Sequence, residues 1–208
     1  MKPLLNFAAL LFCSILVSQE TLDTLKVKTN WKTNGNAIFL INQSSFSNWT
    51  SGGQSSVSGT LKINYNLNYF DNGWAWDTKI LSAFGLNKIS GSDFLKKTDD
   101  RIEINSVVGK KFNNNLIGKW SYSSFFNFQT QFAKGYRFGK DTNGNSIRTE
   151  KSRFFSPATT QLGIGLYWKK DQNFWINVAP MTGKLILVNR LFTKNLNDNQ
   201  SYFGVKQN

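Results

Sequence analysis

The sequence predicts an all-β protein, an antiparallel, up-and-down transmembrane β-barrel of which about seven or eight strands are visible. Three observations lead to this fold class: a long segment of strict alternation, an apolar leader, and connections that alternate between short and long. We expect a signal peptide over residues 1–18, a polar lead-in over 19–30, and one barrel domain over 31–208.

The clearest segment is 57–69, VSGTLKINYNLNY. Its odd positions are apolar, aromatic or glycine, and its even positions are polar. This period of two is typical of a β-strand with one apolar and one polar face. The segment is about twice as long as a usual strand in a soluble domain. When tilted, such a strand is long enough to cross a bilayer, which takes roughly 9–11 residues.

The N-terminus has the layout of a secretory signal peptide. Lys2 precedes an apolar run over 4–17 that is too short for a spanning helix, and cleavage after Ser18 fits a small-residue site. Acylation of Cys13, as in a lipoprotein, is disfavoured by the bulky Phe12 before it. Removal of the leader removes the only cysteine, and the chain has no histidine. The commonest general base and the commonest zinc ligands are therefore missing, and we expect no cofactor, no metal and no enzyme activity.

The charge balance points to an anionic surface. The chain has 25 Lys and Arg against 12 Asp and Glu, a formal net charge of +13. These cations are scattered rather than clustered in a groove, which argues against nucleic acid. For an exported protein we expect outer-membrane lipid and the phosphates of lipopolysaccharide as partners. The mean hydropathy of −0.36 does not exclude a membrane, because barrel strands hide their hydrophobicity in alternation.

The remaining strands follow the same pattern with varying clarity. A turn at 71–73 with glycine favours a hairpin between the second and third strands. We expect short connections after the second, fourth and sixth strands and longer ones after the first, third and fifth, as in outer-membrane barrels. The other predicted strands are 36–46, 74–86, 101–112, 120–132, 158–168, 174–180 and 184–192.

Strand parity assigns each side chain to a face, because a slip of one residue would exchange the two faces. Lys62, Asn64, Asn127 and Gln129 are predicted to face the interior. The residues predicted to face lipid are Leu61, Ile63, Leu67, Tyr122, Phe126 and Phe128. Aromatic residues at strand ends are expected at the lipid headgroups, and these are Tyr69, Trp74, Trp120 and Trp168.

Four charged residues fall on the predicted interior face: Asp77, Lys79, Arg101 and Glu103. They are candidates for a constriction that selects ions. The favoured alternative is a salt-bridged plug that only stabilises a small, filled barrel. Asp99 and Asp100 beside Glu103 could bind calcium through oxygen ligands, but neighbouring lysines would neutralise that cluster.

Two loops have more than one interpretation. The loop 133–157 is basic and aromatic, which suits acidic glycans or lipid phosphates; a simple solvated loop is the alternative. The segment 48–53 is interpreted as a tight outer turn in which glycines allow close approach of the backbone, or as a loop that docks a partner.

Several segments resemble a family of Bacteroidota outer-membrane proteins catalogued only as a domain of unknown function. The matching segments are 31–36, 46–53, 97–105, 126–136, 156–158 and 179–184. The resemblance implies an outer-membrane β-barrel with no established activity and no catalytic residues. Family members resemble longer chains with further strands, and this chain ends at Asn208 without a terminal aromatic strand. We therefore expect a truncated member.

The leading hypothesis is an outer-membrane β-barrel with a structural, transport or surface-interaction role and no catalysis. One alternative is a soluble periplasmic, lipocalin-like binding barrel, whose polar face would be outside. A third hypothesis, a membrane-embedded hydrolase of lipid or glycan, would have to use serine or carboxylate chemistry without histidine.

Overall fold

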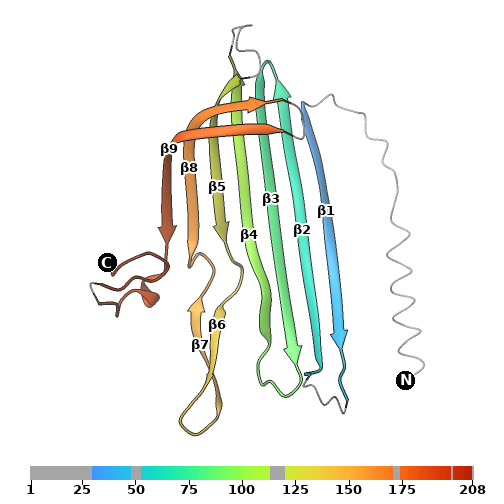
Figure 1. The fold of residues 1–208 in the computed structure, drawn as a ribbon, viewed down its shortest axis with the longest axis vertical. Helices are drawn as coiled ribbons and strands as arrows, with labels where there is room; N and C mark the ends of the chain where they lie inside the picture. The colour runs from blue at the N-terminus through green and yellow to red at the C-terminus, as the bar shows by residue number, and fades with distance from the viewer. Residues whose placement is uncertain (1–29, 48–52, 113–119, 171–173, 198, 208) are drawn as a thin grey trace, which may run out of the picture.

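The computed structural model describes residues 30–47, 53–112, 120–170, 174–197 and 199–207. The predicted signal peptide and residues 19–29 of the lead-in lie outside this part of the chain. Seven strands form one sheet in the order β1-β2-β3-β4-β5-β8-β9, and β6 and β7 form a separate hairpin (Figure 1). The strands are β1 (Trp31–Ser44), β2 (Ser56–Asp71), β3 (Trp74–Ile89), β4 (Lys96–Lys111), β5 (Trp120–Thr130), β6 (Gly135–Lys140), β7 (Ser146–Ser152), β8 (Ala158–Lys169) and β9 (Trp175–Leu187).

Every neighbouring pair of strands is antiparallel, so the all-β, antiparallel part of the prediction is confirmed. Within the described residues the sheet is not a closed barrel, because β1 and β9 are its two edges and do not pair with each other. Both edges run in the same direction, since the sheet has an odd number of strands. No helix in this part of the chain is long and apolar enough to cross a membrane.

The register divides the side chains between two faces, because residues paired directly across strands point to the same side. Leu61, Ile63 and Leu67 of β2 share their face with Tyr122, Phe126 and Phe128 of β5. This face is apolar. Lys62 and Asn64 share the opposite, polar face with Asn127 and Gln129. The two sets of residues therefore lie on opposite faces, as the alternation predicts, and the contact of the apolar face with lipid stays a prediction.

The sheet bends sharply at β8 and β9, and the bend makes the polar face concave. In Figure 1 the last part of β8 and the first part of β9 run across the upper ends of the neighbouring strands. The register between β8 and β9 shifts between Ile164 and Leu166, as at a β-bulge, and bulges bend strands. A Cβ at Gly165 would lie 2.0 Å from the Val178 carbonyl oxygen, so only glycine allows this approach.

The hairpin between β2 and β3 forms where the sequence predicts it, but its turn has two residues instead of three, because Asp71 still pairs with Trp74. Asn72 and Gly73 connect the strands, with φ values of 46° and 76°. Two positive φ angles are typical of a type I′ turn, whose twist matches that of the flanking strands. The turn sets the register that continues across the sheet.

Three strand predictions need correction. β1 begins at Trp31 and β4 at Lys96, five residues earlier than expected in both cases. The predicted seventh and eighth strands, 174–180 and 184–192, are one strand, β9, which continues through Pro180. Proline is tolerated there because β9 is an edge strand with a bulge. Residues Arg190–Phe192 form a short 3-10 helix (η2) instead of a strand end.

The predicted loop 133–157 contains the β6–β7 hairpin. Its strands are short and strongly charged, which hid the alternation in the sequence. The early start of β4 also changes the connections. The connection 90–95 is shorter than the connection 112–119, so the predicted alternation of short and long connections fails at this pair.

Candidate functional site

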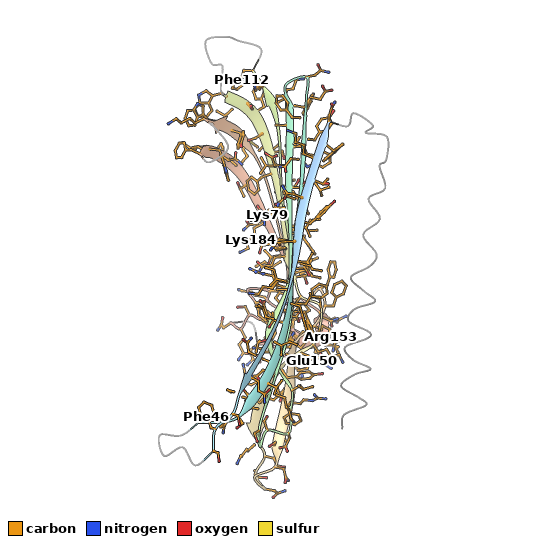
Figure 2. The ribbon with its side chains drawn as sticks, turned by 90° about the vertical axis from the view of Figure 1, so that its right-hand side faces the viewer. Phe46, Lys79, Phe112, Glu150, Arg153 and Lys184 are labelled. Atoms are coloured by element: carbon orange, nitrogen blue, oxygen red, sulfur yellow. The ribbon has the colours of Figure 1, made fainter. Side chains whose placement is uncertain are left out.

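One row of polar side chains crosses the whole width of the concave face. Each of the seven strands contributes one residue, and neighbours in the row are paired directly: Asn34, Asn66, Lys79, Asn105, Asn127, Gln161 and Lys184. In the edge view of Figure 2, Lys79 and Lys184 lie at nearly the same level. We call this set the central polar row. Such a row needs water or a polar ligand beside it, because a buried polar group without a partner is costly.

Amide side chains link the strands within and beside this row. Asn66 Nδ2 donates a hydrogen bond to Asn34 Oδ1 at 2.7 Å. In the next row, Asn64 Nδ2 donates to Asn36 Oδ1 at 2.8 Å. Asn127 Nδ2 donates to Asn105 Oδ1. Each amide has further donors or acceptors available, so the face presents hydrogen-bonding groups to whatever occupies the concave side.

All four predicted interior charges lie on this face, in four consecutive rows. Asp77 accepts a hydrogen bond from Asn68 Nδ2 at 2.6 Å. Glu103 accepts one from Asn105 Nδ2 at 2.7 Å and lies 3.7 Å from the Arg101 guanidinium. Lys79 has no ion-pair or hydrogen-bond partner within the described chain. Of the four residues, only Arg101 and Glu103 form an ion pair. Both interpretations, the constriction and the salt-bridged plug, stay predictions.

The two carboxylates among these four residues, Asp77 and Glu103, are not a catalytic pair. Glu103 pairs with Leu81, and Leu81 lies four residues from Asp77 along β3. Four residues of strand separate the two positions by about 13 Å. Carboxylate pairs that hydrolyse glycosides are about 5–9.5 Å apart. The structure therefore does not bring Asp77 and Glu103 together for acid–base chemistry.

Two contiguous cavities of about 510 and about 850 Å³ lie on the concave side, and we call them together the chamber. Both are lined by Asn68, Asp77, Val107 and Trp175. Trp175 comes from β9 and is 53% exposed. Its ring centroid lies 5.9 Å from that of Tyr167 on β8. The bend of β8 and β9 thus places an aromatic pair beside amides of β2.

The sequence interpretation missed this aromatic pair. Tyr167 and Trp175 are polar-face residues of their strands, next to the predicted interfacial Trp168. Their parity in the sequence is the signal that could have separated them from Trp168. The curvature that brings them over the chamber depends on Gly163 and Gly165, where a Cβ would collide with Phe125 and with β9 respectively.

The apolar face has aromatic residues at both ends. All four predicted interfacial aromatics lie on this face, at the end that contains the β2–β3 turn. Trp31 and Trp76 join them, with the Trp31 ring centroid 5.0 Å from Tyr69 and 5.5 Å from Trp76. At the other end the rings of Phe84 and Phe132 lie 6.4 Å apart.

The spacing of these two aromatic ends suits a bilayer. Trp74 and Phe84 are ten residues apart on β3, which is about 33 Å along the strand. At a barrel tilt of about 40° this corresponds to about 25 Å, the height of the apolar band of outer-membrane barrels. Lys110 lies at the Trp74 end, with Nζ 5.0 Å from the Trp74 ring centroid.

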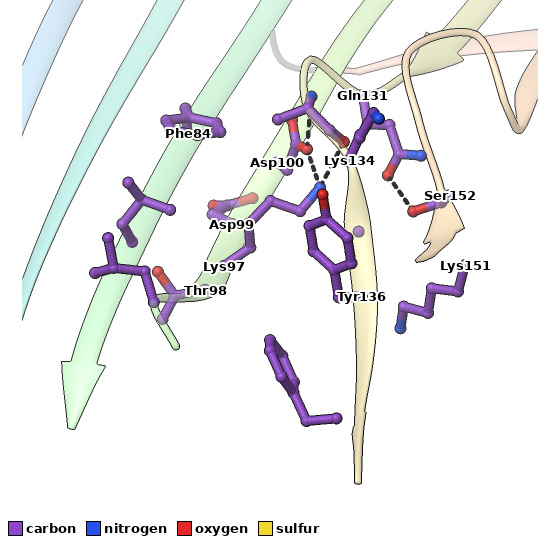
Figure 3. A pocket seen from close by; sticks show the side chains of 15 residues that line it. Phe84, Lys97, Thr98, Asp99, Asp100, Gln131, Lys134, Tyr136, Lys151 and Ser152 are labelled. Carbon is purple, nitrogen blue, oxygen red and sulfur yellow. Dashed lines mark hydrogen bonds and ion pairs between the residues drawn. The ribbon is translucent and has the colours of Figure 1, made fainter. Parts of the chain in front are cut away.

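A further cavity, of about 370 Å³, lies between the start of β4 and the β6–β7 hairpin (Figure 3). Asp100 holds the two parts together. Its carboxylate pairs with Lys97 and accepts hydrogen bonds from the backbone N–H groups of Phe132 at 2.7 Å and Ala133 at 3.1 Å. The Asp100 side chain is 6% exposed. Asp99 is on the opposite face of β4, so the structure does not bring Asp99, Asp100 and Glu103 together as the calcium alternative requires.

The β6–β7 hairpin is cationic and aromatic, as the sequence indicates. The Arg148 guanidinium lies 4.6 Å from the Tyr136 ring centroid and 5.4 Å from that of Phe94. Glu150 accepts a hydrogen bond from Arg153 Nε at 2.6 Å and lies 3.4 Å from Lys134 Nζ. The hydrogen bond from Arg153 is the main cause that lowers the pKa of Glu150 below its ordinary value. The binding of glycans or lipid phosphates by this hairpin stays a prediction.

The two interpretations of segment 48–53 concern residues of which only Gly53 is described.

No curated protein and no solved structure matches the chain. A family model with the description "Protein of unknown function (DUF3078)" matches residues 41–136, from within β1 to the start of β6. This part of the chain, which includes the centre of the concave face, is therefore similar to a family whose description assigns no function.

Proposed function

We propose that the chain forms the wall of an outer-membrane β-barrel with a non-enzymatic role, in which the concave face lines a water-filled interior. The central polar row supports this proposal most directly. It spans all seven strands, and a sheet in lipid needs such a face inside and an apolar face outside.

The apolar face supports the same orientation. Tyr65, Ile80, Ile104 and Phe128 are paired directly across β2 to β5 on this face. Many of its side chains are exposed, among them Tyr122 at 63% and Ile164 at 59%. A contiguous apolar surface of this kind is unusual on a soluble monomer. In lipid it is the contact surface.

Closure of the barrel requires further strands. In lipid every backbone N–H and C=O must be paired, so the free edges of β1 and β9 cannot remain open. Because both edges run in the same direction, an entirely antiparallel barrel needs an odd number of strands between them. The proposal also includes what the resemblance implies, namely a relationship to Bacteroidota outer-membrane proteins in which this chain is a truncated member.

The soluble lipocalin-like barrel requires the opposite arrangement of faces. Its interior would be lined by the apolar face, but here the bend of β8 and β9 folds the sheet toward the polar face. A hydrolase would need its groups in reach of each other, and Asp77 and Glu103 are not. We therefore favour transport, structural or surface-interaction roles over both alternatives.

Two measurements test this proposal: cell fractionation, and the migration of the protein on a gel before and after heating. We expect the protein in the outer-membrane fraction, extracted only by detergent, with a folded band that shifts on boiling. Recovery in the periplasmic soluble fraction would contradict it. A matched pair of variants that separates lipid contact from structural damage is described in the Discussion.

A further inference from the structure

Charges on the concave face are unbalanced. Over four consecutive rows the face has five cationic side chains, Lys32, Lys62, Lys79, Arg101 and Lys184, against two carboxylates. Both carboxylates already have partners: Asn68 for Asp77, and Asn105 with Arg101 for Glu103. None of the four lysines has a hydrogen-bond or ion-pair partner within the described residues. Unpaired ammonium groups on a concave surface attract anions.

Two of these lysines line the chamber. Lys79 borders the cavity of about 510 Å³ and Lys32 the cavity of about 850 Å³. The remaining polar lining is mainly amide: Asn34, Asn66, Asn105, Asn127 and Asn177. Amides both donate and accept hydrogen bonds, which suits the hydroxyl groups of a sugar.

The aromatic pair adds a flat apolar surface. Trp175 is half-exposed and faces into the chamber beside Tyr167. A few convergent polar groups beside aromatic side chains are typical of small-molecule sites. A sugar ring has both hydroxyl groups and C–H faces, and therefore matches the amides and the aromatic rings together.

We propose that the chamber binds anionic sugars, with Lys79 and Lys32 beside the acidic group and Trp175 against the ring. This inference rests on the proposed function, because it takes the concave face as the solvated interior. It goes further by naming the class of solute. Asp77 also lines both cavities and keeps its negative charge when Asn68 donates to it, so Lys32, Lys79 and Asp77 together give the lining a formal charge of +1.

The experiment uses the full chain purified and folded in detergent micelles, with gel migration before and after heating as the check of folding. The three probes are glucuronate, glucose and inorganic phosphate. Binding of the two sugars is followed by saturation-transfer NMR, and binding of phosphate, which has no carbon-bound protons, by its displacement of glucuronate. We expect glucuronate to bind more tightly than either of the others. Raising KCl from about 10 mM to about 500 mM should weaken the binding of glucuronate and leave the affinity for glucose unchanged, because salt screens exposed charges.

Variants locate the site. The double variant Lys32→Gln/Lys79→Gln should weaken glucuronate about tenfold, which corresponds to modest contributions from two partly solvated charges. Trp175→Ala should weaken glucose and glucuronate alike. Lys110→Gln is the matched control for one lost charge, because Lys110 lies on the apolar face. It should change neither affinity.

The outcomes separate this inference from the proposed function. Three results with protein folded in micelles would overturn the anionic-sugar site and leave the barrel proposal standing. These are no binding of either sugar, equal affinity for glucose and glucuronate, and equal affinity for phosphate and glucuronate. An equal loss in Lys110→Gln overturns the site as well. If the chain is instead soluble without detergent, the barrel proposal fails, and the same three titrations on the soluble protein decide the sugar site by the same criteria.

Discussion

The assignment of faces makes its sharpest prediction at Ile80 and Leu81, two neighbouring apolar residues of β3. Ile80 lies on the apolar face, paired with Tyr65 and Ile104. It is four residues from Trp76 and four from Phe84, so it lies about 13 Å along the strand from each aromatic end. In the proposed barrel this position is near the bilayer midplane. Leu81 lies on the concave face, between Asn64 and Glu103.

We expect Ile80→Arg to destabilise the folded protein in lipid by about 2–4 kcal/mol, the cost of a cation on the lipid face near the midplane. This corresponds to a loss of about 30-fold to about 700-fold in the folding equilibrium. Leu81→Arg introduces the same group one residue later. There it meets water and the Glu103 carboxylate, and we expect a change of about 1 kcal/mol or less.

The assay is urea unfolding of protein folded into lipid vesicles, with the folded fraction read from the band that shifts on boiling. Ile63→Arg and Asn64→Arg on β2 repeat the comparison, since Ile63 is on the apolar face and Asn64 on the polar face. If both apolar-face variants are as stable as wild type while the concave-face variants fail to fold, the assignment of faces is wrong. The membrane placement then fails with it.

Three further predictions concern the bend and the hairpin. Gly165→Ala should impair folding in the gel assay, because its Cβ would lie 2.0 Å from a carbonyl oxygen of β9. Gly59→Ala is the control and should fold normally, because nothing lies within 4 Å of the added atom. Asp100→Ala should lower the free energy of unfolding by about 2–4 kcal/mol, because it removes a buried carboxylate that accepts two backbone hydrogen bonds. In limited proteolysis, the β6–β7 hairpin of this variant should be cut faster than that of Asp99→Ala. The lowered pKa of Glu150 means that its stabilisation of the hairpin is present above the ordinary value of 4.5 and is lost as the pH falls through the lowered pKa. NMR amide shifts of the hairpin should follow that titration in wild type and lose it in Glu150→Gln.

Local alternation was sufficient to predict much of the sheet. In β2 and β5 each side chain reports its face directly, since successive residues of a strand point to opposite sides. The same rule placed Asp77, Lys79, Arg101 and Glu103 on one face. The Asn72–Gly73 turn was also predictable, because few residues adopt two consecutive positive φ angles.

The sequence predictions were wrong where local residue patterns conflict with the pairing between strands. Pro180 and Gly183 interrupt the alternation of β9, but pairing with β8 and the bulge between Ile164 and Leu166 continue the strand. In the β6–β7 hairpin, charged side chains such as Arg148 alternate with few apolar ones. The Arg148 guanidinium lies over the rings of Tyr136 and Phe94, and Asp100, which is distant in sequence, binds the backbone just before β6.

The sequence by itself determined that the chain is all-β, the two faces of the central strands and the kinds of groups on each, because these follow from a period of two residues. Only the tertiary structure decided which face is concave, that Trp175 and Tyr167 lie beside Asn68 and Asp77, and that Asp77 and Glu103 are far apart. These facts depend on the register across strands and on the bend at Gly163 and Gly165. Both are set by contacts between residues far apart in the chain, which no local pattern encodes.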